Sequence, residues 1–146
     1  MKSFQELNKD EIALMQLVDS IQLFNHERYI SAITLGGAAE ELLGALLKQF
    51  GNENNINIPT KAELDNSLFE LTTEIHGIKN YISYRNNTRN EIKHHGDERN
   101  KDIVKGNFKQ QALNYISGAI INYKLKHNQL PTDVIISGFC LRYGIN

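Results

Sequence analysis

Apolar residues recur every three or four positions along most of this chain, which is the spacing of helices that bury one face. The first stripe consists of Leu14, Leu17, Val18, Ile21 and Phe24. Asn8 precedes it and is followed three residues later by Glu11, a pairing typical of a helix start. The pattern therefore predicts a helix that begins after Asn8 and ends at a turn formed by residues 25–27.

A second stripe predicts the most regular helix of the chain. Its apolar positions are Ala32, Leu35, Ala39, Leu42, Leu46 and Phe50, and Gly51 is expected to end it. This helix also contains Gly36, Gly37 and Gly44, each of which costs about 1 kcal/mol of helix propensity. Small residues at these positions would let a neighbouring helix approach closely, either from the same chain or from a second copy.

The third stripe starts after Thr60, which with Glu63 forms another predicted cap. The stripe consists of Leu64, Leu68, Leu71, Ile75, Ile78 and Ile82. Continued at the same spacing, it reaches Arg85 or Asn86 and then Arg89, before Gly96 ends the predicted helix. A basic residue on the buried side of a helix needs a partner, a cavity or a ligand.

Glu40 and Glu41 of the second predicted helix are the candidate partners for such an arginine. Either carboxylate would supply the counter-charge that a buried arginine requires. The simpler expectation is that both glutamates lie on the surface.

A fourth stripe, after a predicted cap at Asn107 and Gln110, consists of Leu113, Ile116, Ile120 and Tyr123 and ends near His127. Residues 131–133 then introduce an apolar tail, Val134 to Tyr143, which is expected to pack back on the other helices. Together the stripes predict an all-α, up-and-down four-helix bundle with a short C-terminal helix. Residues 1–146 are expected to form one domain.

The composition fits a globular domain and limits the kinds of partner. The 146 residues are 40% hydrophobic and 23% charged, with a formal net charge of −1. Attraction to an anion must therefore come from a local patch. The single cysteine, Cys140, excludes an intramolecular disulfide and fits a reducing compartment. Without an apparent signal peptide or an apolar run near 18 residues, we expect a cytoplasmic protein that does not enter a membrane.

The residues between Tyr84 and Gly96 form that local basic patch, with two arginines, one lysine, two histidines and three asparagines. Glu91 is the only acidic residue among them. The glycine-rich phosphate-binding motifs of nucleotide-binding folds are absent from the sequence. Glu91 and His94 make one E-x-x-H pair, whereas di-iron bundles need two. No metal site and no cofactor are therefore predicted.

The sequence from Arg89 to His94, Arg-Asn-Glu-Ile-Lys-His, resembles the R-x(4–6)-H motif of the HEPN superfamily. Members of that superfamily are small four-helix bundles that carry the motif near the end of the third helix, often with a polar residue such as Asn90 after the arginine. The glycine- and alanine-rich second helix with Glu40 and Glu41 is also similar to bacterial members. The resemblance covers essentially the whole chain.

The resemblance implies a metal-independent endoribonuclease, acting as a toxin or defence component. It also implies a homodimer in which the motifs of two protomers face one cleft, with RNA or a nucleotide as ligand and an antitoxin as a protein partner. Some toxins of this superfamily carry a modified tyrosine two positions after the motif histidine. Gly96 occupies that position here, so no such modification is expected.

Each residue of the patch has a role that its chemistry supports. Arg89 would donate paired hydrogen bonds to a phosphate, His94 would transfer protons near neutral pH, and Asn90, one turn before His94, would orient it. The remaining residues would contact RNA or its phosphates: Arg85, Asn86, Lys93 and His95. His95 also satisfies the motif spacing from Arg89.

Helix geometry sets a difficulty for one copy of the motif. Five residues of α-helix turn through about 500°, so Arg89 and His94 would lie about 140° apart around the axis. Pooling of motifs by two protomers would remove this problem. Two alternatives remain open: a non-catalytic module that binds RNA or a nucleotide, and a helical assembly protein whose basic patch is merely solvated.

Overall fold

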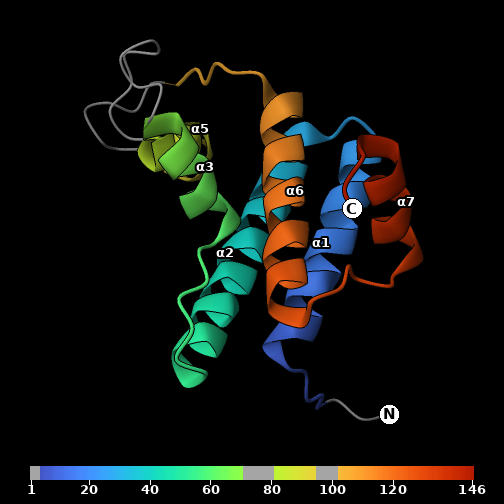
Figure 1. The fold of residues 1–146 in the computed structure, drawn as a ribbon. Coiled ribbons are helices and arrows are strands. Elements are labelled where there is room, and N and C mark those ends of the chain that lie inside the picture. The colour runs from blue at the N-terminus through green and yellow to red at the C-terminus, as the bar shows by residue number, and fades with distance from the viewer. Residues whose placement is uncertain (1–3, 71–80, 95–101) are drawn as a thin grey trace.

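The computed structural model describes residues 4–70, 81–94 and 102–146. Over these residues the chain is all-helical, as the apolar stripes predict (Figure 1). The helices are α1 (Lys9–Asn25), α2 (Tyr29–Glu53), α3 (Lys61–Glu70), α5 (Tyr81–Lys93), α6 (Phe108–His127) and α7 (Val134–Tyr143).

The centre of the molecule is formed by α1, α2 and α6 (Figure 1). A short turn reverses the chain between α1 and α2, so these two helices are antiparallel. In contrast, α6 runs parallel to α2: Gly36 faces Tyr115 and Ile116 one turn before Glu40 meets Gly118. One turn further along, Gly44 faces Asn122. The close neighbour expected for the glycines of α2 is therefore supplied by the same chain.

The buried face of α2 is displaced by one residue from the predicted seam. Leu35, Leu42, Leu46 and Phe50 are only partly buried. The residues that are buried are Ala32, Ile33, Gly36, Gly37, Ala39, Glu40, Leu43, Gly44, Leu47 and Gly51. The displacement arises because a hydrophobicity pattern treats glycine as neither apolar nor polar. In the structure, the glycines of α2 lie on its buried face. The displacement places Glu40 in the middle of the buried face.

Most predicted helix starts are confirmed by their hydrogen bonds. The side chain of Asn8 accepts from the backbone N–H of Glu11, and the Glu11 carboxylate accepts from the Asn8 N–H in return. Thr60 Oγ1 accepts from the Glu63 N–H, and Asn107 Oδ1 accepts from the Gln110 N–H. Each bond satisfies one of the amide groups left free at a helix start.

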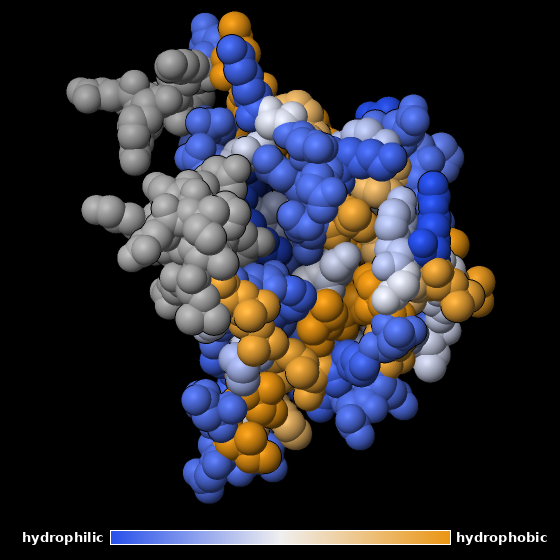
Figure 2. All heavy atoms as spheres, turned by 45° about the horizontal axis from the view of Figure 1, so that its top comes forward, coloured by the Kyte–Doolittle hydropathy of each residue, from blue (hydrophilic) through white to orange (hydrophobic). Residues whose placement is uncertain are grey.

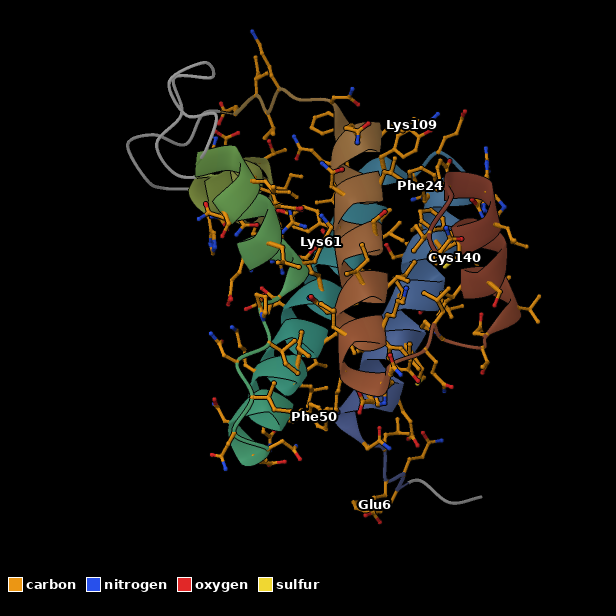
Figure 3. The ribbon with its side chains drawn as sticks, viewed as in Figure 1. Glu6, Phe24, Phe50, Lys61, Lys109 and Cys140 are labelled. Atoms are coloured by element: carbon orange, nitrogen blue, oxygen red, sulfur yellow. The ribbon has the colours of Figure 1, made fainter. Side chains whose placement is uncertain are left out.

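The C-terminal helix α7 packs on α1, as predicted for the apolar tail. Its contact includes an aromatic cluster in which the ring of Phe24 lies edge-on to Phe139 and Tyr143, with ring centres 5.8 Å away in both cases. Phe24 and Cys140 mark this layer in Figure 3. Burial raises the pKa of the Cys140 thiol, consistent with its predicted place as a small residue of the core.

The third predicted helix is only partly described. It is represented by α3 and α5, and residues 71–80, with Leu71, Ile75 and Ile78, lie outside the described residues. The stripe is wrong at its start, because Leu68 is 65% exposed and Leu64 is also exposed. At the other end α5 stops at Lys93, three residues before Gly96, which is not described.

Helix α2 is also long and apolar enough to meet a length-and-hydropathy test for a membrane span, contrary to the expectation that no segment would do so. Half of this apolar segment of α2 is buried inside the protein. Its buried face packs on α1 and α6 and includes the ionisable residue Glu40. These are the contacts of a core helix, which account for its apolar composition.

Candidate functional site

A buried ion pair joins the motif-bearing helix α5 to α2. Arg85 donates from Nη1 to Glu40 Oε1 at 2.5 Å and from Nη2 to Glu40 Oε2. Arg85 is 8% exposed and Glu40 is 7% exposed. The two parallel hydrogen bonds match the fork of a guanidinium to a carboxylate. Because either charge alone would be costly inside the protein, the pair fixes α5 against α2.

Glycines make the space for these charged groups. A Cβ atom at Gly118 of α6 would overlap the Glu40 carboxylate. A Cβ atom at Gly37 of α2 would lie 2.6 Å from Arg89 Nε. Glycines of α2 and α6 therefore accommodate the polar side chains between the helices.

Tyr115 of α6 completes the surroundings of the pair. The Arg85 guanidinium lies over its ring, 4.6 Å from the ring centre. The Tyr115 hydroxyl lies 2.8 Å from Asn86 Oδ1 and 3.1 Å from the Arg85 carbonyl oxygen. Burial raises the pKa of Glu40, while the hydrogen bonds and charge of Arg85 oppose that rise.

A second buried polar residue, Asn122 of α6, links three helices. Its Nδ2 donates to the backbone oxygen of Glu40 at 3.2 Å. Its Oδ1 accepts from the backbone N–H of Lys61 at 2.8 Å, where α3 begins beside α6 (Figure 3). The polar centre of the molecule thus connects α2, α3, α5 and α6.

Arg89 lies one turn after Arg85, closer to the surface. Both of its terminal nitrogens lie 3.3 Å from Glu41 Oε2. The Glu41 side chain is 74% exposed, whereas the Arg89 side chain is 14% exposed. Arg89 Nε is buried and has no hydrogen-bond partner among the residues that the structure describes. Arg89 is therefore held by a solvated carboxylate through long hydrogen bonds.

The other motif residues lie on the outside. Asn90 and Lys93 are exposed on α5, and His94 is exposed just after its last residue. The His94 backbone N–H donates to the Asn90 carbonyl at 3.0 Å. Lys93 and His94 line a shallow depression together with Ile30, Glu91, Ile92, Asp102, Val104 and Phe108. Arg89 does not line this depression.

Two of the predicted RNA-contacting residues have partners inside the protein. Arg85 is engaged by Glu40, and Asn86 is partly buried against the Tyr115 hydroxyl. The expectation that both glutamates lie on the surface is wrong for Glu40. His95 lies outside the described residues. Of the predicted site, Asn90, Lys93 and His94 remain on the surface, with Arg89 beneath the exposed Glu41.

Sequence reasoning missed Tyr115 and Asn122 as members of the polar centre. The hydrogen bonds of Tyr115 are long-range contacts with α5 that no local pattern shows. Asn122 interrupts the apolar part of α6 and has a buried side chain. A buried asparagine must satisfy its amide, so an asparagine within an apolar stripe was a usable signal.

The described residues contain no group of three or more histidine, cysteine, aspartate or glutamate side chains placed to hold a metal ion. Comparisons of the chain with protein-family models, with curated proteins and with solved structures gave no match.

Proposed function

We propose that this chain is a HEPN-type, metal-independent endoribonuclease that acts as a homodimer. In this proposal α1, α2 and α6, together with α3 and α5 as parts of the third bundle helix, form the up-and-down four-helix bundle, with α7 as the additional short helix. Arg89, Asn90 and His94 are its catalytic residues. Lys93 contributes to RNA binding, and Arg85 acts as the anchor that fixes α5.

The observation that supports this proposal most is the contrast between Arg85 and Arg89. Arg85 is closed in by Glu40, whereas Arg89 faces an exposed carboxylate over 3.3 Å. Because the Glu41 carboxylate is solvated and its hydrogen bonds to Arg89 are long, a phosphate can displace Glu41 from Arg89. A buried anchoring arginine is thus followed one turn later by an arginine whose carboxylate partner can be replaced. This arrangement is suited to binding an anion.

The chemistry requires no metal. The RNA 2′-hydroxyl attacks the adjacent phosphorus, the bond to the 5′-oxygen breaks, and the products are a 2′,3′-cyclic phosphate and a 5′-hydroxyl. His94 moves protons in this reaction, because histidine titrates near neutral pH. Arg89 stabilises the negative charge that develops on the phosphate oxygens. Asn90, which is exposed on α5 one turn before His94, orients His94.

Two copies are part of the proposal because Arg89 does not line the depression that contains His94, and the two residues lie about 140° apart around an ideal helix. In a dimer that brings two α5 ends together, Arg89 of one protomer and His94 of its partner face the same phosphate. Neither side chain then needs to reach round its own helix.

The test is cleavage of end-labelled, mixed-sequence RNA in EDTA by the wild type and by Arg89→Ala and His94→Ala. We expect each variant to lose at least about a hundredfold in rate, the contribution of a positioned general acid or base. His26→Ala and Arg142→Ala are matched controls, since both side chains are exposed on other parts of the molecule. Equal cleavage by wild type and His94→Ala would contradict the proposal.

A second candidate is an RNA-binding module without catalysis, which the exposure of Lys93 and His94 favours. Such a module would bind RNA with an affinity that falls steeply as salt increases, because phosphate contacts release counterions. Lys93→Ala would reduce that salt dependence. RNA binding without any cyclic-phosphate product, under conditions where the dimer is intact, would favour this candidate over the enzyme.

A further inference from the structure

The side chain of Arg89 leaves α5 and lies against α2. A Cβ atom at Gly37 would lie 2.6 Å from Arg89 Nε, 2.9 Å from its Cδ and 3.0 Å from its Cζ. The guanidinium ends beside Glu41, one turn after Gly37 on the same helix. Glycine at position 37 therefore leaves the space that this side chain crosses, and Glu41 lies where it ends.

Arg89 is held weakly in this position. Its Nε is buried without a hydrogen-bond partner among the described residues, which is unfavourable for an N–H group. Its two terminal nitrogens share one oxygen of Glu41 at 3.3 Å, whereas charge-assisted hydrogen bonds of this kind usually measure about 2.7–2.9 Å. The Tyr115 ring centre lies 5.9 Å from Arg89 Cζ, compared with 4.6 Å for Arg85. Glu41 thus keeps the guanidinium against α2 through a contact that opens easily.

This position leaves Arg89 outside the depression that contains His94. That depression is formed where α5 ends beside the start of α2 and the start of α6. An arginine side chain has many rotamers, so Arg89 can leave the space beside Gly37 without movement of the backbone. Hydrophilic residues are prominent on the end of the molecule that Figure 2 brings forward, so a guanidinium released toward this end enters a polar environment.

We propose that Glu41 is a positioning residue and that its ion pair with Arg89 is an autoinhibitory contact. While Glu41 holds the guanidinium, the terminal N–H groups of Arg89 face a carboxylate instead of a phosphate. When the contact opens, the Arg89 side chain leaves the space beside Gly37 and binds the anion. The catalytic consequence rests on the proposed ribonuclease function, whereas the restraint of Arg89 and its competition with an anion do not.

NMR of the arginine Nε–H groups tests the restraint without RNA. In Glu41→Ala we expect the Arg89 Nε–H to exchange with solvent about two- to fivefold faster than in the wild type, the range that corresponds to loss of a solvated ion pair. Its signal is identified by its absence from Arg89→Lys. The Arg85 signal is the internal reference, because Arg85 is held by a buried carboxylate. Glu63→Ala is the matched control, since it removes a carboxylate from another partly exposed ion pair.

Gly37→Ala releases Arg89 by a second route, with Glu41 intact. The added methyl group takes the space that Arg89 Nε and Cδ occupy, and these atoms belong to a flexible side chain that can move aside. Alanine also favours the helix, so loss of folding is not expected. The Arg89 Nε–H should again exchange faster, by at least as much as in Glu41→Ala. Gly138→Ala is the control, because a Cβ atom at Gly138 meets nothing within 4 Å.

Inorganic phosphate is the probe for anion binding. Titration followed by the Arg89 Nε signal should give a dissociation constant about two- to fivefold lower for Glu41→Ala than for the wild type, because no internal carboxylate competes. Glu63→Ala removes the same charge at another place and should match the wild type. Unchanged phosphate affinity in Glu41→Ala would overturn the autoinhibitory contact.

RNA cleavage links the contact to the reaction. Glu41→Ala and Gly37→Ala should lower KM about two- to fivefold and leave kcat unchanged, since they remove a competing state without touching the groups that act on the phosphate. A variant damaged only in its structure would instead lose kcat.

Equal Nε–H exchange in the wild type and Glu41→Ala would overturn the proposal, as would a higher KM for a folded Gly37→Ala. Faster exchange and tighter phosphate binding beside a wild type that leaves RNA intact would support the contact and contradict the ribonuclease alone. Failure of this inference and failure of the proposed function are thus distinguishable.

Discussion

Arg85 and Arg89 are the same residue type one turn apart on α5, yet their surroundings assign them different tasks. Arg85 meets Glu40 inside the protein, and Arg89 meets Glu41 at the surface. The two neighbouring glutamates of α2 therefore give the arginines different roles. Arg85 anchors the helix, and Arg89 has a carboxylate partner that a ligand can replace. In the proposed enzyme the first positions the helix and the second binds the scissile phosphate.

Truncation of the two glutamates tests this division by stability. Glu40→Ala leaves Arg85 buried without its carboxylate, and we expect the free energy of unfolding to fall by about 3–5 kcal/mol. Glu41→Ala is the matched control and should cost no more than about 1 kcal/mol, because its carboxylate is solvated. Urea denaturation of both variants measures the difference. Equal losses would contradict the assignment of Glu40–Arg85 as the anchor.

At the scale of single residues, the sequence predicted part of this centre. It indicated that an arginine would continue an apolar stripe and would need a counter-charge, and Glu40 was one of two candidates. It could not choose between Glu40 and Glu41, because the glycines of α2 obscured which face is buried. From α6, Tyr115 contacts Arg85 and Asn122 donates to the Glu40 backbone oxygen, and no spacing within α5 or α2 reveals such contacts.

At the scale of the elements, the small residues of α2 and α6 set how closely these parallel helices approach. Gly36 shows the limit: a Cβ atom there would lie 3.3 Å from Ile116 Cγ1 of α6 and 2.9 Å from Ser20 Oγ of α1. The helix boundaries were predictable where a cap precedes a stripe, as at Asn8 and Asn107. The third stripe failed at Leu68 because helical spacing alone does not say whether a partner helix is present.

Two glycine-to-alanine changes separate close packing from helix propensity. Gly118→Ala would place a methyl group against the Glu40 carboxylate, so we expect a loss of about 1–3 kcal/mol in unfolding free energy. Gly138 on α7 has no neighbour within 4 Å of such a Cβ atom, so Gly138→Ala should raise stability by about 0.5–1 kcal/mol. Thermal unfolding monitored by circular dichroism compares them. A destabilising Gly138→Ala or a neutral Gly118→Ala would contradict this packing.

At the scale of the whole molecule, a second ion pair joins the start of α1 to the end of α6, away from the Glu40–Arg85 pair. Asp10 at the start of α1 accepts from Lys126 Nζ at 2.8 Å and lies 3.3 Å from His127 Nε2. Burial acts to raise the pKa of Asp10, but Lys126 and His127 together outweigh it and hold the pKa below its ordinary value of 3.8.

The lowered pKa of Asp10 determines how the stability of the protein changes with pH. A carboxyl with a lowered pKa in the folded state stabilises the protein above its unfolded pKa, and that contribution is lost as pH falls through the folded value. Asp10→Asn should therefore lower the melting temperature near neutral pH and reduce its fall between about pH 5 and pH 2. Asp19→Asn, on the exposed side of α1, is the control. Parallel melting curves for wild type and Asp10→Asn would contradict this assignment.

The central claim is that Arg89 of one copy and His94 of another act on the same phosphate. The most direct measurement is RNA cleavage in EDTA by the wild type, by Arg89→Ala, by His94→Ala and by the two variants mixed after subunit exchange. We predict that the wild type cuts and leaves 2′,3′-cyclic phosphate ends, each variant alone is inactive, and the mixture recovers part of the activity. A heterodimer then contains one intact Arg89–His94 pair. An inactive mixture beside an active wild type would contradict pooling by two copies, and no cleavage by the wild type dimer would contradict the ribonuclease.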